Sequence, residues 1–306
     1  MFEITKNQSN KDIPEGMNAA QAAEHYRAMT IGFQPKLTGP VISAHGDKWV
    51  FRGDKCTTSL KGFGAEPLIA ACKERTLVYC APRAGMAPDA VATLGHLYAK
   101  RCVFFCPASA EPSPHQRALL GYRAELRFIK IAAMPTLNIF AEKWAKQNGA
   151  KFLPFGLSKS PLVTAGIIRL ADIITKQIGH EPSQVWMSVS TGTAIRAFQL
   201  AWPNAEIRGV VVARNMKDGE IGRAKLWSSA VPFLKDAKKS ELPPFPSTNN
   251  YDAKCWSDFQ EFGKSGSIFI NVGADEKVFK MAKMFEGVKI DSQREWGDMR
   301  DLERGL

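Results

Sequence analysis

The sequence has no apolar run long enough to cross a membrane and no cysteine pattern typical of a metal site. Its six cysteines form no C-x-x-C pair. Two of them stand in the stretch "CVFFC", where a thiol usually packs as a small buried hydrophobe. A bilayer-spanning helix needs ~20 mostly apolar residues in a row, and the chain has no such stretch. The sequence therefore argues against a membrane protein and against a structural zinc site.

The chain also lacks a recognisable targeting segment and has fewer acidic than basic residues. The N-terminal stretch "MFEITKNQSNKDIPEGMNAAQ" has no basic start, apolar middle or cleavage site of a signal peptide, so we expect a cytoplasmic protein. The 41 lysines and arginines outnumber the 30 acidic residues, which gives a net charge of +11. A charge of this sign raises the encounter rate with polyanions such as nucleic acid.

Short apolar runs alternate with amphipathic segments from about residue 46 onward. Runs such as "TLVYCAP" and "QVWMSVS" are typical of buried strands, and "PLVTAGIIRLADIITKQIG" has the spacing of a helix. Another helix is expected to begin near Pro67. Strands separated by helices predict parallel sheets. We predict an α/β fold with two parallel-sheet domains, the larger from residues 1–76 and 160–306 and a smaller inserted one from residues 77–159.

Two strand-to-helix turns carry residues suited to binding anions. In the first, Ser190, Thr191, Gly192 and Thr193 follow a buried strand and precede a helix. Backbone N–H groups and three hydroxyls at a helix start favour a phosphate site, although a simple N-cap is the alternative. The second turn, "PRAGM", contains Arg83, and an arginine at such a turn suits a carboxylate or a phosphate.

A lysine among small and hydroxylated residues precedes both turns. Lys61 lies in "TSLKGFGA", and the order of this segment, "PRAGM" and "STGT" resembles the fold type II pyridoxal-phosphate enzymes, the tryptophan synthase β and threonine synthase group. In that family a lysine in a segment such as SFKDRGA holds pyridoxal 5'-phosphate as a Schiff base. The resemblance implies this catalytic role for Lys61. Lys55, in "RGDKC", is the alternative, because some members carry the lysine in a GNK context.

The resemblance covers about residues 45–280 and implies further cofactor-binding residues. "VSTGTA" is similar to the family's phosphate loop, which assigns the cofactor phosphate to residues 190–193, although one glycine of the family loop is missing. "IFINVGAD" falls where the family places the partner of the cofactor's ring nitrogen. This implies Asn271, which could equally cap the next helix. The resemblance also implies a cofactor cleft between the two domains, as in tryptophan synthase β, and a homodimer.

The loop that grips the substrate carboxylate in the family, S-x-G-N, is replaced here by "PRAGM". The expected substrate-binding residues are therefore Arg83, Ala84, Gly85 and Met86. Because this loop differs from the family's carboxylate-binding loop, β-elimination on a small free amino acid is less strongly expected.

Together with the charge of +11, this loop suggests a large anionic substrate that bears an amino-acid group. The resulting hypothesis is a lyase that decarboxylates an amino-acid-modified base in DNA, acting in the host cytoplasm if the protein is viral. One alternative is elimination or replacement at Cβ of a serine-, threonine- or cysteine-like amino acid. The other is a catalytically inactive relative that binds nucleic acid.

Overall fold

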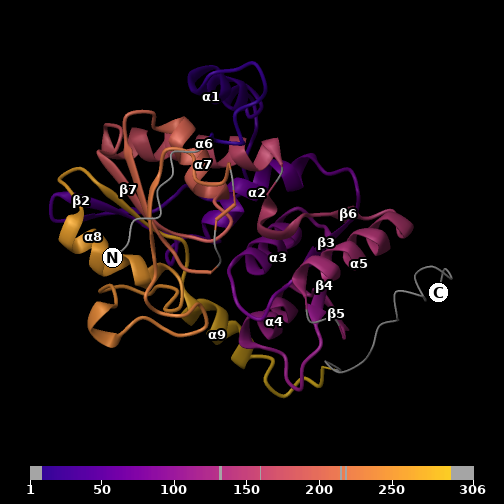
Figure 1. Ribbon diagram of the computed structural model, residues 1–306. Coiled ribbons are helices and arrows are strands. Elements are labelled where there is room, and N and C mark those ends of the chain that lie inside the picture. The colour runs from indigo at the N-terminus through magenta and orange to yellow at the C-terminus, as the bar shows by residue number, and fades with distance from the viewer. Residues whose placement is uncertain (1–8, 131–132, 159, 214–215, 218, 291–306) are drawn as a thin grey trace. The chain divides into compact units, whose positions relative to one another are not determined.

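Two compact units make up the chain in the computed structural model (Figure 1), which describes residues 9–130, 133–158, 160–213, 216–217 and 219–290. One unit takes its residues from the ranges 1–67 and 160–275, and the other from 68–159 and 276–306. Each has its own sheet, and neighbouring strands are parallel in both apart from one hairpin. The predicted α/β fold class with two parallel-sheet units is confirmed, while the cofactor cleft between them stays a prediction.

The first unit is organised around a six-stranded sheet in the order β1-β2-β10-β7-β8-β9. β1 pairs antiparallel with β2 through a hairpin, and the remaining pairs of this described sheet are parallel. Because the carboxyl ends of parallel strands share one edge of the sheet, the loops after them can form one site. The strands are β1 (Ile42–His45), β2 (Lys48–Arg52), β7 (Gln184–Val189), β8 (Glu206–Val211), β9 (Lys225–Ser228) and β10 (Ile268–Asn271).

Side chains of both faces of this sheet are buried, as the apolar strand runs predict. On one face, Trp186 and Phe269 pack in an apolar cluster with Phe259 of α8. On the other, Phe51 of β2 meets Phe63 of α2 edge to face. The helices of this unit are α1 (Ala19–Ala28), α6 (Pro161–Ile178), α7 (Thr193–Ala201), α8 (Trp256–Phe262) and the first part of α2 (Leu60–Ala71).

Helix α2 begins at Leu60, and the prediction that it begins near Pro67 is wrong. Proline favours the first turn of a helix, but here Pro67 lies inside α2. Close packing requires glycine at two positions in and beside this helix. A Cβ on Gly62 would lie 2.1 Å from the Thr58 side chain, and one on Gly166 of α6 would lie 2.5 Å from the carbonyl oxygen of Gly64. The backbones of α2 and α6 therefore touch.

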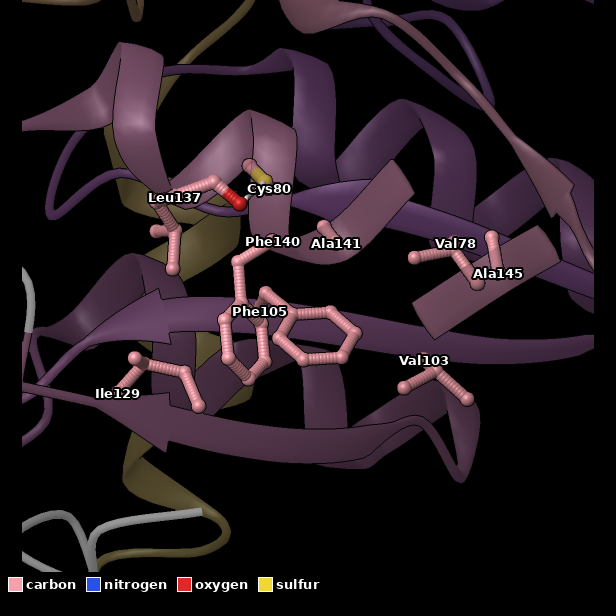
Figure 2. Close-up of a cluster of buried hydrophobic side chains, with 9 residues drawn as sticks. All are labelled: Val78, Cys80, Val103, Phe105, Ile129, Leu137, Phe140, Ala141 and Ala145. Carbon is pink, nitrogen blue, oxygen red and sulfur yellow. Dashed lines mark hydrogen bonds between the residues drawn. The ribbon is translucent and has the colours of Figure 1, made fainter. Parts of the chain in front are cut away.

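The second unit contains the four-stranded parallel sheet β5-β4-β3-β6. Figure 2 shows the core on one of its faces, where the rings of Phe105 and Phe140 lie 5.7 Å apart between centroids. The Cys80 thiol in this core donates to the carbonyl oxygen of Leu137. The elements are β3 (Thr76–Cys80), β4 (Arg101–Pro107), β5 (Glu125–Ile129), β6 (Lys151–Phe152), α3 (Ala87–Leu97), α4 (Pro114–Ala118), α5 (Met134–Gln147) and most of α9 (Asp275–Lys283).

Residues 276–290 belong to the second unit, whereas the sequence-based division assigned them to the larger domain. The Arg117 guanidinium donates to the carbonyl oxygens of Phe285 and Val288, at 2.9 and 3.0 Å. Met281 of α9 packs against Gly121, where a Cβ would lie 2.3 Å from the Met281 sulfur. Long-range side-chain contacts of this kind leave no mark on the local sequence. Residues 1–8 and 291–306, which the division also assigned, lie outside the described residues.

In the described part of the chain, the structure contains no helix with the length and apolarity needed to span a membrane. It also contains, within the same residues, no cluster of histidine, cysteine, aspartate and glutamate that could hold a metal ion.

Candidate active site

A small pocket lies within the first unit, where β7 and β10 end and where α2 and α7 begin. The empty space in and around its mouth is about 270 Å³, part of which is open solvent. Parallel sheets bind ligands beyond the carboxyl ends of their strands, so the position is the expected one. The pocket is lined by Leu60, Lys61, Tyr251, Val272 and the continuous segment from Met187 to Ile195. Lys61 and the turn of residues 190–193 thus share one pocket.

The turn between β7 and α7 depends on glycine at position 192. Gly192 has a φ of +71°, in the left-handed region that residues with a Cβ rarely adopt. A Cβ here would also lie 2.4 Å from the carbonyl oxygen of Glu220. The neighbouring hydroxyls of Thr191 and Thr193 lie 3.2 Å apart. The turn is therefore compact, and the backbone at Glu220 packs directly against Gly192.

The start of α7 presents backbone donors to the pocket. The first intrahelical bond runs from the N–H of Arg196 to the carbonyl oxygen of Gly192. The N–H groups of Thr193, Ala194 and Ile195 are left, as at any helix start, without an intrahelical acceptor. All three residues line the pocket. Free N–H groups and the positive end of the helix dipole attract an anion, and a phosphate group fits this chemistry.

Lys61 lies in the first turn of α2, which is fastened to the end of β10. The N–H of Leu60 donates to the carbonyl oxygen of Val272 at 2.9 Å. The pKa of the Lys61 amine is lowered from 10.5 to about 8, first by burial and then by the positive charge of Arg196, while Asp252 acts in the opposite direction. Burial and a like charge both disfavour the ammonium form. The amine is therefore prepared to act as a nucleophile near neutral pH.

This shift predicts how the reactivity of Lys61 depends on pH. At a pKa of about 8, ~10% of the amine is neutral at pH 7, against ~0.03% for an ordinary lysine. Competitive acetylation with acetic anhydride, read by mass spectrometry across pH 6–11, should give a midpoint of about 8 for Lys61. The exposed Lys55 provides the internal reference. A Lys61 midpoint close to that of Lys55 would contradict the expectation.

Lys55, the alternative to Lys61, lies in the turn that follows β2. Its backbone N–H donates to the carbonyl oxygen of Arg52, and its side chain is exposed. The pocket described above is lined by Lys61, and Lys55 is not part of that lining. Burial and position therefore favour Lys61 over Lys55 for amine chemistry.

Asp252, which the sequence analysis did not single out, lies behind the pocket wall. It is fully buried between the lining residues Tyr251 and Val272. Its Oδ2 accepts from the Thr248 hydroxyl at 2.6 Å and from the N–H of Val272 at 3.0 Å, and the N–H of Gly273 also stabilises the charged carboxylate. Burial raises the Asp252 pKa to about 8. At neutral pH the Asp252 carboxyl is therefore largely protonated, and it can donate a hydrogen bond as well as accept one.

Asn271, expected to face the cofactor ring, is buried at the end of β10, where its side chain makes three hydrogen bonds, and its role toward a cofactor stays a prediction. Its amide donates to Asp54 Oδ1 at 3.0 Å and to the carbonyl oxygen of Pro246 at 2.9 Å. Its Oδ1 accepts from the Ser247 hydroxyl at 2.8 Å. The pocket lining contains the next residue, Val272.

The four residues expected to bind substrate lie in the second unit, in the loop between β3 and α3. Arg83 is exposed and donates to the carbonyl oxygen of Glu111 at 3.2 Å. Gly85 has a φ of +126°, and Met86 is the buried N-cap residue of α3. Ala84 is half-buried between them. The substrate-binding role of these residues stays a prediction.

Comparison with known proteins supports the fold and not a specific activity. No family model and no curated protein matches the sequence. Among solved structures, an ACC deaminase homologue matches with a TM-score of 0.69 and 13% identity over 84% of this chain and 98% of its own. Threonine deaminase isoform 2 from Solanum lycopersicum matches with a TM-score of 0.64 and 13% identity, over 93% of this chain and 98% of the deaminase. Diaminopropionate ammonia lyase from Escherichia coli matches with a TM-score of 0.62 and 13% identity. The match covers 92% of this chain and 98% of the lyase.

All three neighbours are fold type II pyridoxal-phosphate enzymes. The chain therefore has the fold type II architecture, as the order of its sequence motifs predicted. The matches span nearly the whole length of each neighbour, so both units of the fold are present.

Proposed function

We propose that the protein is a pyridoxal-phosphate-dependent enzyme that acts on an amino-acid group. The observation that carries the proposal is the pocket that unites the Lys61 amine with the anion-binding turn at the start of α7. The fold is that of enzymes with this cofactor, and one solved diaminopropionate ammonia lyase holds an aminoacrylate–PLP azomethine intermediate. The residues of the pocket match the chemical groups of the cofactor.

Two parts of the site would hold the cofactor. The backbone N–H groups and hydroxyls of residues 190–195 would bind its phosphate, and Lys61 would supply the amine that meets its aldehyde. Asp252, buried behind Tyr251 and Val272 and outside the pocket lining, would act on the ring only through its electrostatic field, and the role of Asn271 at the ring nitrogen stays a prediction. When bound, pyridoxal phosphate supplies an aldehyde that condenses with amines and a ring that withdraws electrons from the substrate. Lys61, once its amine is released, would carry protons to and from the substrate carbon.

The direct test is to add pyridoxal phosphate to the purified protein and to record the visible spectrum. We expect an absorption band at about 410–430 nm, because the cofactor joins a protein amine. Borohydride reduction followed by peptide mapping should then place the cofactor on the peptide that contains Lys61. Free pyridoxal, which lacks the phosphate, is the matched control and should bind much more weakly. Absence of the band would refute the proposal, and label on Lys55 in place of Lys61 would assign the amine to Lys55.

For the reaction, we propose removal of the carboxyl group from an amino acid attached to a DNA base. The support is the net charge of +11 and the "PRAGM" loop in place of the family's carboxylate clamp. With DNA carrying such a base as substrate, the expected product is carbon dioxide, and activity should fall steeply with salt because the substrate is a polyanion.

The alternative is β-elimination or replacement on a free amino acid. It would instead give ammonia and a keto acid, or a replaced side chain, with little dependence on salt. A protein that binds DNA but shows neither the cofactor band nor turnover would be an inactive relative. Sedimentation of the holoenzyme would test the homodimer that the resemblance implies.

A further inference from the structure

Arg196 is a fully buried arginine directly behind the anion-binding turn. It lies in the first turns of α7, and none of its surface is exposed. Its Nη1 donates to the carbonyl oxygen of Thr191 at 3.2 Å and approaches that of Glu220 at 3.5 Å. A Cβ on Gly192 would lie 2.8 Å from the same Nη1. The guanidinium thus packs against the back of the turn, on the side away from the pocket.

The N-terminal segment of residues 10–12 holds this arginine in place. Asp12 Oδ2 accepts from Arg196 Nε at 3.0 Å, and the Asn10 amide donates to the Arg196 carbonyl oxygen at 3.1 Å. Lys11 pairs with Glu220 at 3.1 Å and so joins the segment to the loop that also contacts Arg196. A charge as deeply buried as Arg196 requires such partners, because an unpaired one would be expensive.

The charge of Arg196 reaches both parts of the pocket. It lowers the pKa of Lys61, whereas Asp252, from the other wall, raises it. Arg196 also donates to the Thr191 carbonyl oxygen. This hydrogen bond keeps the negative end of the carbonyl dipole pointed away from an anion in the pocket. A fixed positive charge in a place of low dielectric acts strongly over short distances. The turn lacks one glycine of the family's phosphate loop. The charge of Arg196 would add to the anion affinity of the backbone N–H groups that remain.

We propose that Arg196 is a positioning residue for a dianionic phosphate group at the turn of residues 190–193, and that the segment 10–12 tunes it through Asp12. The identity of the phosphate compound rests on the proposed function, but the role of Arg196 does not. Arg196 fixes the turn, adds positive charge behind the anion, and favours the neutral form of the Lys61 amine. Asp12 offsets part of that charge.

The test uses inorganic phosphate as the probe and the full chain without cofactor. Calorimetry should show that Arg196→Gln binds phosphate at least about 10-fold more weakly than the unmodified protein, because a charged hydrogen-bonding group is lost. Acetylation of Lys61 should show a raised pKa in the same variant. Arg196→Lys, which keeps the charge, should retain the low Lys61 pKa. An unchanged phosphate affinity, or an unchanged Lys61 pKa in folded Arg196→Gln, would overturn the proposal.

Asp12→Asn provides a test with the opposite sign. The asparagine keeps an oxygen that accepts from Arg196 Nε but loses the negative charge, so phosphate should bind more tightly and the Lys61 pKa should fall. A purely structural role for the segment predicts weaker binding and no fall in pKa, and that result would reject the electrostatic role even if Arg196→Gln fails to fold. Because neither measurement uses pyridoxal phosphate, the proposal for Arg196 and the proposed function can fail separately.

Discussion

A Lys61→Ala variant should lose the visible cofactor band and should turn over substrate about 10²–10⁴-fold more slowly, the contribution expected of a positioned acid–base group. The physical reason is that Lys61 supplies the amine in the pocket, with its pKa lowered to about 8. In the proposed function this amine would meet the aldehyde of the cofactor and would afterwards carry protons at the substrate carbon. Alanine can do neither, although the backbone N–H groups at the start of α7 are left in place.

The matched control for this experiment is Lys55→Ala. Lys55 is exposed and separate from the pocket lining, so its loss should leave the band and the rate within about twofold of the unmodified protein. Inorganic phosphate should bind Lys61→Ala and the unmodified protein with comparable affinity, because the backbone donors remain. A band that survives in Lys61→Ala and disappears in Lys55→Ala would assign the amine to Lys55 instead.

Gly192→Ala should lower the free energy of unfolding by about 2–5 kcal/mol and abolish measurable phosphate binding. The left-handed φ of +71° costs an alanine about 1–2 kcal/mol, and crowding against Glu220 adds about 1–3 kcal/mol. Relief of this strain requires the turn to move, and that movement misplaces the N–H groups of Thr193 and Ala194. Urea unfolding and phosphate calorimetry measure the two effects.

Gly179→Ala separates the backbone cost from the crowding cost. Gly179 ends α6 with a φ of +85°, and no atom lies within 4 Å of a Cβ built on it. This variant should therefore lose only about 1–2 kcal/mol and should bind phosphate normally. If Gly192→Ala is no less stable than Gly179→Ala, the crowded turn described here is incorrect.

Much of the fold could be predicted because its signals are local. The run "QVWMSVS" is apolar because β7 is buried on both faces, and Gly179 ends α6 in the left-handed conformation that glycine favours. The turn at Ser190 was recognisable since strand, hydroxyl residues and helix follow one another in the chain. Lys61 was conspicuous for its small neighbours, which the structure explains by close packing of α2.

The parts that were missed depend on contacts between distant segments. Asp252 and Arg196 are ordinary charged residues in the sequence, and only burial beside the pocket gives them a role. The direction of the Asn271 amide likewise depends on its hydrogen bonds to Asp54 and Ser247, which are distant in the chain. The strand β1 escaped notice because it is short and owes its existence to antiparallel pairing with β2.

The backbone contact between α2 and α6 restricts how this sequence can vary. A side chain at position 166 would push against the carbonyl oxygens of Phe63 and Gly64, in the helix that carries Lys61. Homologues can therefore exchange most surface residues, but a glycine at 166 should be inherited together with the lysine at 61 and the glycine at 192. These three positions, at their separations along the chain, form a signature for finding relatives whose overall identity is too low for an ordinary sequence search.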